Sequence, residues 1–297
     1  MKRRAADPGT WAAVIPCLDE AGAVEATLRD LVAATRDRPP EAIVVVDDGS
    51  TDGTGELLDR LAAEGSVPGL RVLHHGRRKG YGAAIKTGIR HVHSDTVVIL
   101  DADGTYPVDR VPDLLGAMAA ADMAVGSRTG DHVEIPRARR FPKEILRRFA
   151  SWLVGEPIPD VNSGLRAFRK EIFDRYRRIL PDGFSLTTTL TIAMLRGGYE
   201  VVFLPIDYAA RVGRSKIRPI VDTLRFFQLV FRCGIHFAPL RIFGPALVVL
   251  FTATAASALY DTFVLANLTD KTVLLLVTSL NVALFALLAD MIDTRSG

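Results

Sequence analysis

Two long uncharged stretches near the C-terminus constrain this chain more than any other feature of its sequence. Ile242–Tyr260 contains 19 consecutive uncharged residues and Thr272–Ala289 contains 18. As helices they would each be about 27 to 29 Å long, close to the roughly 30 Å hydrocarbon core of a bilayer. A buried hairpin in a soluble core is the alternative. Because only Asp261–Lys271 separates the two stretches, the sequence favours two membrane-spanning helices.

The charges around these stretches predict their orientation. Arg232 and Arg241 precede the first stretch and Arg295 follows the second, whereas Lys271 is the one basic residue between them. Basic residues favour the cytoplasmic side, so we expect a multi-pass protein of the cell (inner) membrane with both termini in the cytoplasm. Arg225–Arg241 mixes phenylalanines with arginines, which predicts a helix in the headgroup region, with an amphipathic core helix as the alternative.

The rest of the chain has the composition of a water-soluble domain. Only eight of the 71 charged residues lie in residues 226–297. The net charge of +3 is too small to indicate a nucleic-acid partner, and we expect none. Cys17 and Cys233 are far apart and belong to no metal-binding pattern, so we interpret both as reduced thiols.

Before residue 127, short β-branched runs alternate with helical patterns. This alternation predicts an α/β fold with a mostly parallel sheet and helices on both faces. The expected strands are Ala12–Pro16, Ala42–Asp47, Leu70–His74, Thr96–Leu100 and Met123–Gly126. The expected helices are Ala21–Thr35, Gly53–Ala63, Gly82–His91 and Val108–Ala121. Neither a GxGxxG dinucleotide motif nor a GxxxxGK[ST] phosphate loop occurs.

Asp101-Ala102-Asp103 is the strongest chemical signal in the chain. Two carboxylates just past a strand can hold Mg²⁺ or Mn²⁺, and such an ion can neutralise a diphosphate leaving group. A solvated acidic turn is the plain alternative. A second alternative is a haloacid-dehalogenase-like phosphatase with Asp101 as nucleophile, but in that class the motif lies near the N-terminus and an acidic pair follows later in the chain.

The order of the motifs resembles the family 2 glycosyltransferases, which have a GT-A fold. The resemblance is to the branch with dolichyl-phosphate mannose synthase and the bacterial polyprenyl-phosphate sugar transferases that carry two C-terminal spans. It covers nearly the whole chain. The matching segments are Val14–Glu20 (VIPCLDE), Val45–Thr54 (VVDDGSTDGT), Lys79–Ala84 (KGYGAA), Asp101–Gly104 (DADG), Gly126–Arg128 (GSR), Asp160–Arg166 (DVNSGLR) and Arg211–Lys216 (RVGRSK).

The resemblance implies roles for particular residues on the donor side. Asp101 and Asp103 would hold the metal on the diphosphate, while Thr105 stands where the family often has Gln. The residues implied to bind the nucleotide sugar are Pro16, Leu18, Glu20, Asp47, Asp48, Lys79, Ala102, Arg211 and Lys216.

On the acceptor side, the resemblance implies that basic residues bind a lipid phosphate, for which the guanidinium fork is well suited. Arg128 would act in catalysis together with Asp101 and Asp103. The implied acceptor-phosphate residues are Arg128, Arg139, Arg140, Lys143, Ser163 and Arg166. A solvated basic face is the alternative for each of the charged ones.

One absence supports a phosphate acceptor. Transfer to a hydroxyl needs a general base, commonly an Asp at the start of a helix, and the corresponding stretch here, Phe184–Thr191 (FSLTTTLT), contains no carboxylate. A lipid phosphate is already ionised near neutral pH and needs no such base. We therefore expect an inverting, metal-dependent transferase that moves one sugar from a nucleotide-diphosphate donor to a polyprenyl phosphate. Transfer to a lipid or protein hydroxyl, the phosphatase and an inactive membrane scaffold remain alternatives.

The expected organisation has four parts. Residues 1–218 would form the cytoplasmic GT-A domain, 219–241 interfacial amphipathic helices, 242–291 a two-helix transmembrane hairpin and 292–297 a cytoplasmic tail. The sequence leaves the oligomeric state open, and a homo-oligomer is compatible with it.

Overall fold

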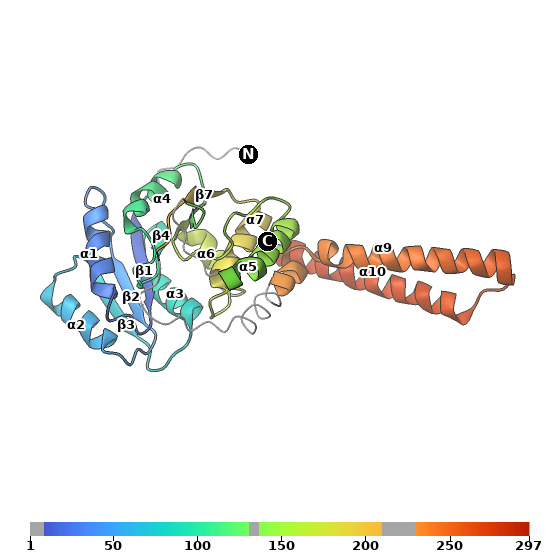
Figure 1. Ribbon diagram of the computed structural model, residues 1–297, viewed down its shortest axis with the longest axis horizontal. Coiled ribbons are helices and arrows are strands. Elements are labelled where there is room, and N and C mark those ends of the chain that lie inside the picture. The colour runs from blue at the N-terminus through green and yellow to red at the C-terminus, as the bar shows by residue number, and fades with distance from the viewer. Residues whose placement is uncertain (1–8, 131–136, 210–227, 229, 297) are drawn as a thin grey trace.

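The protein combines a sheet domain with a long helical hairpin that projects from it (Figure 1). The computed structural model describes residues 9–130, 137–209, 228 and 230–296, without the side chains of 137–143, 146 and 292–296. The sheet has seven strands in the order β3-β2-β1-β4-β6-β5-β7. The strands are β1 (Trp11–Cys17), β2 (Ile43–Asp47), β3 (Leu70–His74), β4 (Thr96–Ile99), β5 (Met123–Ser127), β6 (Arg166–Arg169) and β7 (Val201–Pro205).

The sheet is mostly parallel, as the sequence predicts. β1 pairs in parallel with both β2 and β4, and β5 pairs in parallel with β7. β6 is the exception, because it lies antiparallel to β4 on one side and to β5 on the other. All seven residues of β1 are buried, which explains why this strand is a continuous apolar run without alternation.

Helices cover both faces of the sheet and bury alternate residues of each strand. Trp11, Ala13 and Ile15 of β1 belong to a cluster with α1, α2 and α4, whereas Ala12 and Val14 belong to one with α3, α6 and α7. The helices of the sheet domain are α1 (Val24–Ala34), α2 (Thr54–Glu64), α3 (Tyr81–Ile89), a short η1 (Val108–Arg110), α4 (Val111–Ala117), α5 (Arg137–Val154), α6 (Lys170–Tyr176) and α7 (Leu186–Arg196).

A third apolar cluster joins the sheet domain to the base of the hairpin. Residues of α5 and α7 pack there against a helical segment at 230–237, in which Val230, Cys233 and Phe237 are buried and Phe231 is exposed. One face of this segment therefore belongs to the protein core. The segment lies within Arg225–Arg241, which the sequence predicts to lie in the headgroup region. Arg196 of α7 donates to the carbonyl oxygen of Phe237 over 2.9 Å.

The hairpin consists of α9 (Pro239–Tyr260), a π-helical turn η2 (Asp261–Leu265) and α10 (Asp270–Ser296). Both helices are long and apolar enough to cross a membrane, and most of their large apolar side chains are exposed. Small polar side chains connect them: Thr254 with Ser279 at 3.1 Å and Ser257 with Thr272 at 2.5 Å. The hairpin turn lies at the end farthest from the sheet domain (Figure 1).

Candidate active site

The loops that follow β1 and β2 interlock at the carboxyl edge of the sheet, where ligands bind in folds of this class. The backbone nitrogen of Asp19 donates to Ser50 Oγ over 2.9 Å, and Asp19 Oδ1 accepts from the backbone nitrogen of Thr51 over 2.8 Å. Asp19 has a positive φ of 53°, a conformation that Asp tolerates better than most residues. These contacts fix the loop that carries the predicted donor residues Leu18 and Glu20, both partly buried. Pro16 is buried within β1 itself.

The buried carboxylate of Asp48 holds the loop that follows β3. Its carboxylate accepts from the backbone nitrogens of Lys79 and Gly80, each over 2.8 Å, and pairs with His75 Nδ1 at 2.7 Å. Asp48 and His75 are both buried, while the Lys79 side chain is exposed. Asp48 therefore positions the loop that contains the predicted donor ligand Lys79.

Asp47 has a different set of partners. Its Oδ1 accepts from the backbone nitrogen of Ser50 over 3.0 Å, and its Oδ2 lies 3.1 Å from His74 Nδ1. His74 Nε2 lies 2.9 Å from Asp59. The hydrogen bonds to Asp59 and Asp47 raise the pKa of His74 above its ordinary value. Neither histidine was predicted as a site residue, although their position at the end of the third predicted strand was a usable signal.

The Asp101-Ala102-Asp103 motif follows β4 and is held from both sides. Tyr81 donates its hydroxyl to Asp101 Oδ1 over 2.9 Å, and Asp103 Oδ1 accepts from Thr105 Oγ1 over 2.7 Å. Ala102 is buried, and its carbonyl oxygen accepts from Thr27 over 3.3 Å. Burial and the nearby Asp101 raise the pKa of Tyr81, so the phenol stays protonated and acts as the donor.

Arg128 directly follows β5 and forms an ion pair with Asp160. Its Nε donates to Asp160 Oδ2 over 2.6 Å, and its Nη2 donates to Asp160 Oδ1 over 2.8 Å and to Asn162 Oδ1 over 2.7 Å. The side chains of Arg128 and Asp160 are 12% and 2% exposed. The guanidinium also lies 5.3 Å from the ring centre of Tyr208. A lipid phosphate that bound Arg128 would have to share it with Asp160.

The other predicted acceptor residues have different surroundings. Arg166 is completely buried in β6 and donates to the carbonyl oxygens of Ser163 and Thr187, which places it inside the protein rather than at a surface that a lipid phosphate reaches. Burial lowers its pKa to about 10, so it remains charged at neutral pH. Ser163 is buried too and donates to the carbonyl oxygen of Gly126.

Five predicted basic residues fall outside what the structure describes. Arg139, Arg140 and Lys143 belong to the first part of α5, where the backbone is helical but the side chains lie outside the described residues. Arg211 and Lys216 lie in residues 210–227, also outside them. Their proposed contacts with donor and acceptor remain predictions.

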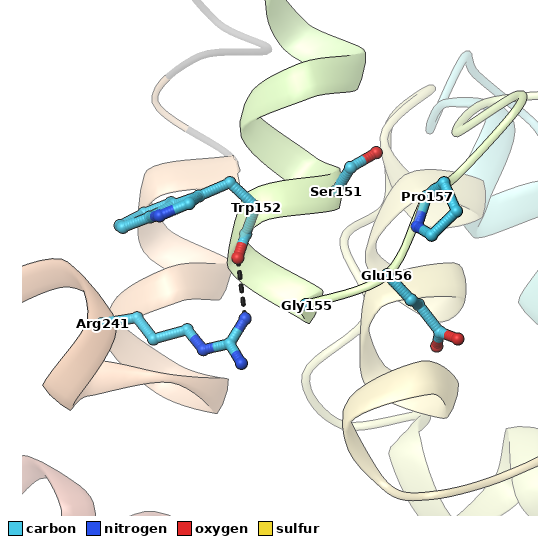
Figure 2. Close-up of a pocket in the computed structure, with 6 residues that line it drawn as sticks. All are labelled: Ser151, Trp152, Gly155, Glu156, Pro157 and Arg241. Carbon is cyan, nitrogen blue, oxygen red and sulfur yellow. Dashed lines mark hydrogen bonds between the residues drawn. The ribbon is translucent and has the colours of Figure 1, made fainter.

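An open pocket of about 510 Å³ lies where α5 meets the start of α9 (Figure 2). Arg241 reaches from α9 to the last turn of α5 and donates to the carbonyl oxygens of Trp152 and Leu153 over 2.7 and 3.2 Å. Gly155 lies beside the guanidinium, and a Cβ at this position would lie 2.7 Å from its Nη atoms, so Arg241 would have to shift. A cation at a helix C-terminus is electrostatically favourable. This contact holds the base of the hairpin against the sheet domain.

Family models match both parts of the chain. The model for glycosyl transferase family 2 matches residues 12–177, and the model for the GtrB C-terminal hairpin matches residues 238–294. The chain belongs to glycosyl transferase family 2. The match includes Asp101–Gly104, so the phosphatase interpretation of that motif is dropped.

Two relatives of this family 2 glycosyltransferase have names that refer to phosphorylated polyprenyl lipids. It is 33% identical over 217 residues to an undecaprenyl-phosphate mannosyltransferase of Micrococcus luteus, covering 69% of this chain and 86% of the relative. It is 34% identical over 190 residues to a polyprenol monophosphomannose synthase of Mycolicibacterium smegmatis, covering 60% of this chain and 71% of the relative. The chain is thus an enzyme of the hexosyltransferase type.

Solved structures support the fold of the glycosyltransferase. Glucosyl-3-phosphoglycerate synthase of Mycobacterium tuberculosis, in complex with Mn²⁺, UDP and phosphoglyceric acid, matches with a TM-score of 0.59. The sequence identity is 22%, and the match covers 76% of this chain and 79% of the synthase. At this identity the likeness concerns the GT-A-like fold alone.

The aspartate motif of the glycosyltransferase fits a divalent metal held partly by substrate. Within the described residues, no three His, Cys, Asp or Glu side chains gather as a metal cluster. Asp101 and Asp103 supply hard oxygen atoms, and Mg²⁺ in enzymes is commonly bound by one or two carboxylates together with substrate phosphates and water. Asp101 and Asp103 are therefore suited to a metal that arrives with a diphosphate.

Proposed function

We propose that this glycosyltransferase moves a single sugar from a nucleotide-diphosphate donor to a polyprenyl phosphate at the cytoplasmic face of the cell membrane, with inversion at the anomeric carbon. The observation that carries the proposal is the fusion of a family 2 catalytic domain to an exposed apolar hairpin. Two relatives with this catalytic domain are named for transfer to undecaprenyl phosphate and for synthesis of polyprenol monophosphomannose. A membrane-anchored domain of this kind is suited to a lipid acceptor.

The donor would bind over the loops that follow β1, β2 and β4. Asp101 and Asp103 would hold Mg²⁺ or Mn²⁺, which neutralises the charge of the departing diphosphate. Asp48 keeps the backbone of the Lys79 loop in place, and we assign the Lys79 side chain to the nucleotide diphosphate. The complex of the M. tuberculosis synthase with Mn²⁺ and UDP supports this arrangement by analogy of fold.

The acceptor phosphate would attack the anomeric carbon directly. A phosphate monoester is ionised near neutral pH and needs no general base to become a nucleophile. The start of α7 accordingly carries Ser185, Thr187 and Thr188 and no carboxylate over Phe184–Thr191. Positioning of the two substrates and neutralisation of their charge would supply the rate enhancement. We assign the attraction of the acceptor to Arg128 and to the basic start of α5.

The hairpin would place the active site at the membrane surface. α9 is 22 residues long and would span about 33 Å as a helix, enough for the hydrocarbon core. Because its turn lies far from the sheet domain, residues 266–269 would emerge on the opposite side of the bilayer (Figure 1). Three arginines lie near the base of the hairpin (Arg232, Arg241 and Arg295), whereas a single basic residue, Lys271, lies near the turn. This excess of positive charge favours a cytoplasmic catalytic domain.

A pair of matched acceptors tests this proposal. The purified full-length protein in detergent, supplied with Mg²⁺ or Mn²⁺, is incubated with a panel of nucleotide sugars and either undecaprenyl phosphate or undecaprenol. We expect lipid-linked sugar with the phosphate acceptor, no product with the alcohol and loss of product with EDTA or in Asp103→Ala. Product with undecaprenol would instead support transfer to a hydroxyl, and full activity of Asp103→Ala would overturn the metal assignment.

A further inference from the structure

Tyr81 links the aspartate motif to a neighbouring loop, although it is not one of the predicted site residues. It is the first residue of α3, and its hydroxyl donates to Asp101 Oδ1 over 2.9 Å. One face of its ring stacks on Phe184, with ring centres 5.3 Å apart and planes inclined by 15°. Tyr81 thus contacts both Phe184 and a carboxylate that we assign to the metal.

The surrounding backbone leaves the Tyr81 ring little freedom. Gly80 and Gly82, which flank it, approach Pro181–Gly183 so closely that a side chain at either glycine would collide with the backbone. The backbone nitrogen of Ala83 donates to the carbonyl oxygen of Asp182 over 3.0 Å. Lys86, one turn further along α3, pairs with the Asp182 carboxylate at 2.8 Å. The two loops therefore form one unit around the ring.

Gly164 approaches Asp101 from another direction. An added Cβ at Gly164 would lie 2.6 Å from Asp101 Oδ2 and 2.8 Å from Asp101 Oδ1, so the backbone of the Asp160–Arg166 motif passes directly beside this carboxylate. The backbone nitrogen of Gly164 in turn donates to Tyr106 Oη over 2.7 Å. The orientation of Asp101 is thus set by a hydroxyl donor on Oδ1 and by close backbone packing beside the whole carboxylate.

We propose that Tyr81 is a positioning residue that orients the Asp101 carboxylate for the metal–diphosphate complex, with Phe184 holding the Tyr81 ring in place. The inference rests on the proposed function, because it assumes that Asp101 binds a metal. A donor on one oxygen of a ligating carboxylate fixes its rotation and directs its remaining electron pairs to the ion. Such outer partners typically contribute about 10- to 100-fold to metal affinity or activity.

Tyr81→Phe separates orientation from packing, because it keeps the ring and the stack on Phe184 and removes only the hydroxyl. We would measure the Kd of Mn²⁺ for the full-length protein by calorimetry, with UDP and with GDP separately present. We expect Tyr81→Phe to raise this Kd about 10- to 100-fold. The melting temperature and the metal-free affinity for the nucleotide should stay near those of wild type, and excess Mn²⁺ should restore most of kcat.

Tyr199→Phe is the matched control. Its hydroxyl accepts from Arg175 over 2.8 Å, and it lies outside the aspartate motif. This variant should leave the Mn²⁺ Kd unchanged, and Phe184→Ala should raise it less than Tyr81→Phe does.

A Kd for Tyr81→Phe within twofold of wild type would overturn the inference while leaving the metal site intact. If wild type itself binds no Mn²⁺ with either nucleotide, the metal assignment in the proposed function fails, and the inference fails with it.

Discussion

The buried pair between Arg128 and Asp160 yields a prediction whose magnitude follows from its geometry. Asp160→Ala removes the acceptor of three hydrogen bonds from Arg128, including one from its backbone nitrogen at 3.1 Å. It also leaves the guanidinium, whose side chain is only 12% exposed, without its anionic partner. Breaking a buried ion pair in this way costs about 3 to 5 kcal/mol. For a domain of this size each kcal/mol lowers Tm by about 2 to 4 °C, so we expect a decrease of roughly 6 to 20 °C.

Thermal unfolding in detergent, followed by tryptophan fluorescence at one scan rate, measures this effect. Trp11 is buried in the sheet domain and reports its unfolding. Asp174→Ala is the matched control, because it breaks an exposed pair with Lys170 at 2.7 Å within one helix. Such pairs are worth about 0.3 to 0.5 kcal/mol, so its Tm should fall by no more than about 2 °C. Equal decreases of Tm for the two variants would show that the Arg128–Asp160 ion pair does not stabilise the fold.

Three further predictions concern other parts of the molecule. The raised pKa of His74 means that its protonated form stabilises the fold below pH 6.5 and that this contribution is lost as the pH rises through the folded-state pKa. His74→Asn should therefore lower Tm more at pH 6 than at pH 9, and equal shifts would contradict this. Gly82→Ala should collide with the facing loop and cost about 1 to 3 kcal/mol, whereas Gly116→Ala, with open space around it, should not destabilise; denaturant titration distinguishes them. Asp261→Ala removes an acceptor from Thr269 at the hairpin turn and should speed hydrogen exchange there, and unchanged protection would refute this role.

Most of the fold follows from local sequence patterns. The five predicted strands agree with β1 to β5 to within one residue at each end. β1, β2, β4 and β5 are buried throughout, and buried parallel strands form continuous apolar runs between helical patterns. The insertion of β6 between β4 and β5 could not be predicted in this way. β6 is four residues long with an arginine at each end, so its sequence lacks the pattern of a buried strand.

The position of the motif loops was predictable from the sequence, but the pairing of their side chains was not. The motifs correctly indicated loops at the carboxyl ends of strands, yet the partners of their side chains come from distant parts of the chain. Asp48 with His75, Tyr81 with Asp101 and Arg128 with Asp160 are 27, 20 and 32 residues apart. No local periodicity encodes such contacts.

Arg166 illustrates the same limit. The family resemblance implied a phosphate ligand at this position, whereas its place in a central strand makes it a buried donor to backbone carbonyls.

The central claim is that sugar is transferred to a lipid phosphate. The most direct measurement is mass spectrometry of the lipid formed when purified protein in proteoliposomes receives undecaprenyl phosphate and a nucleotide sugar labelled in the sugar. We expect one labelled sugar per lipid, joined through a phosphodiester, with nucleoside diphosphate released in equal amount. A product with the sugar on a hydroxyl, or release of inorganic phosphate without lipid-linked sugar, would contradict it.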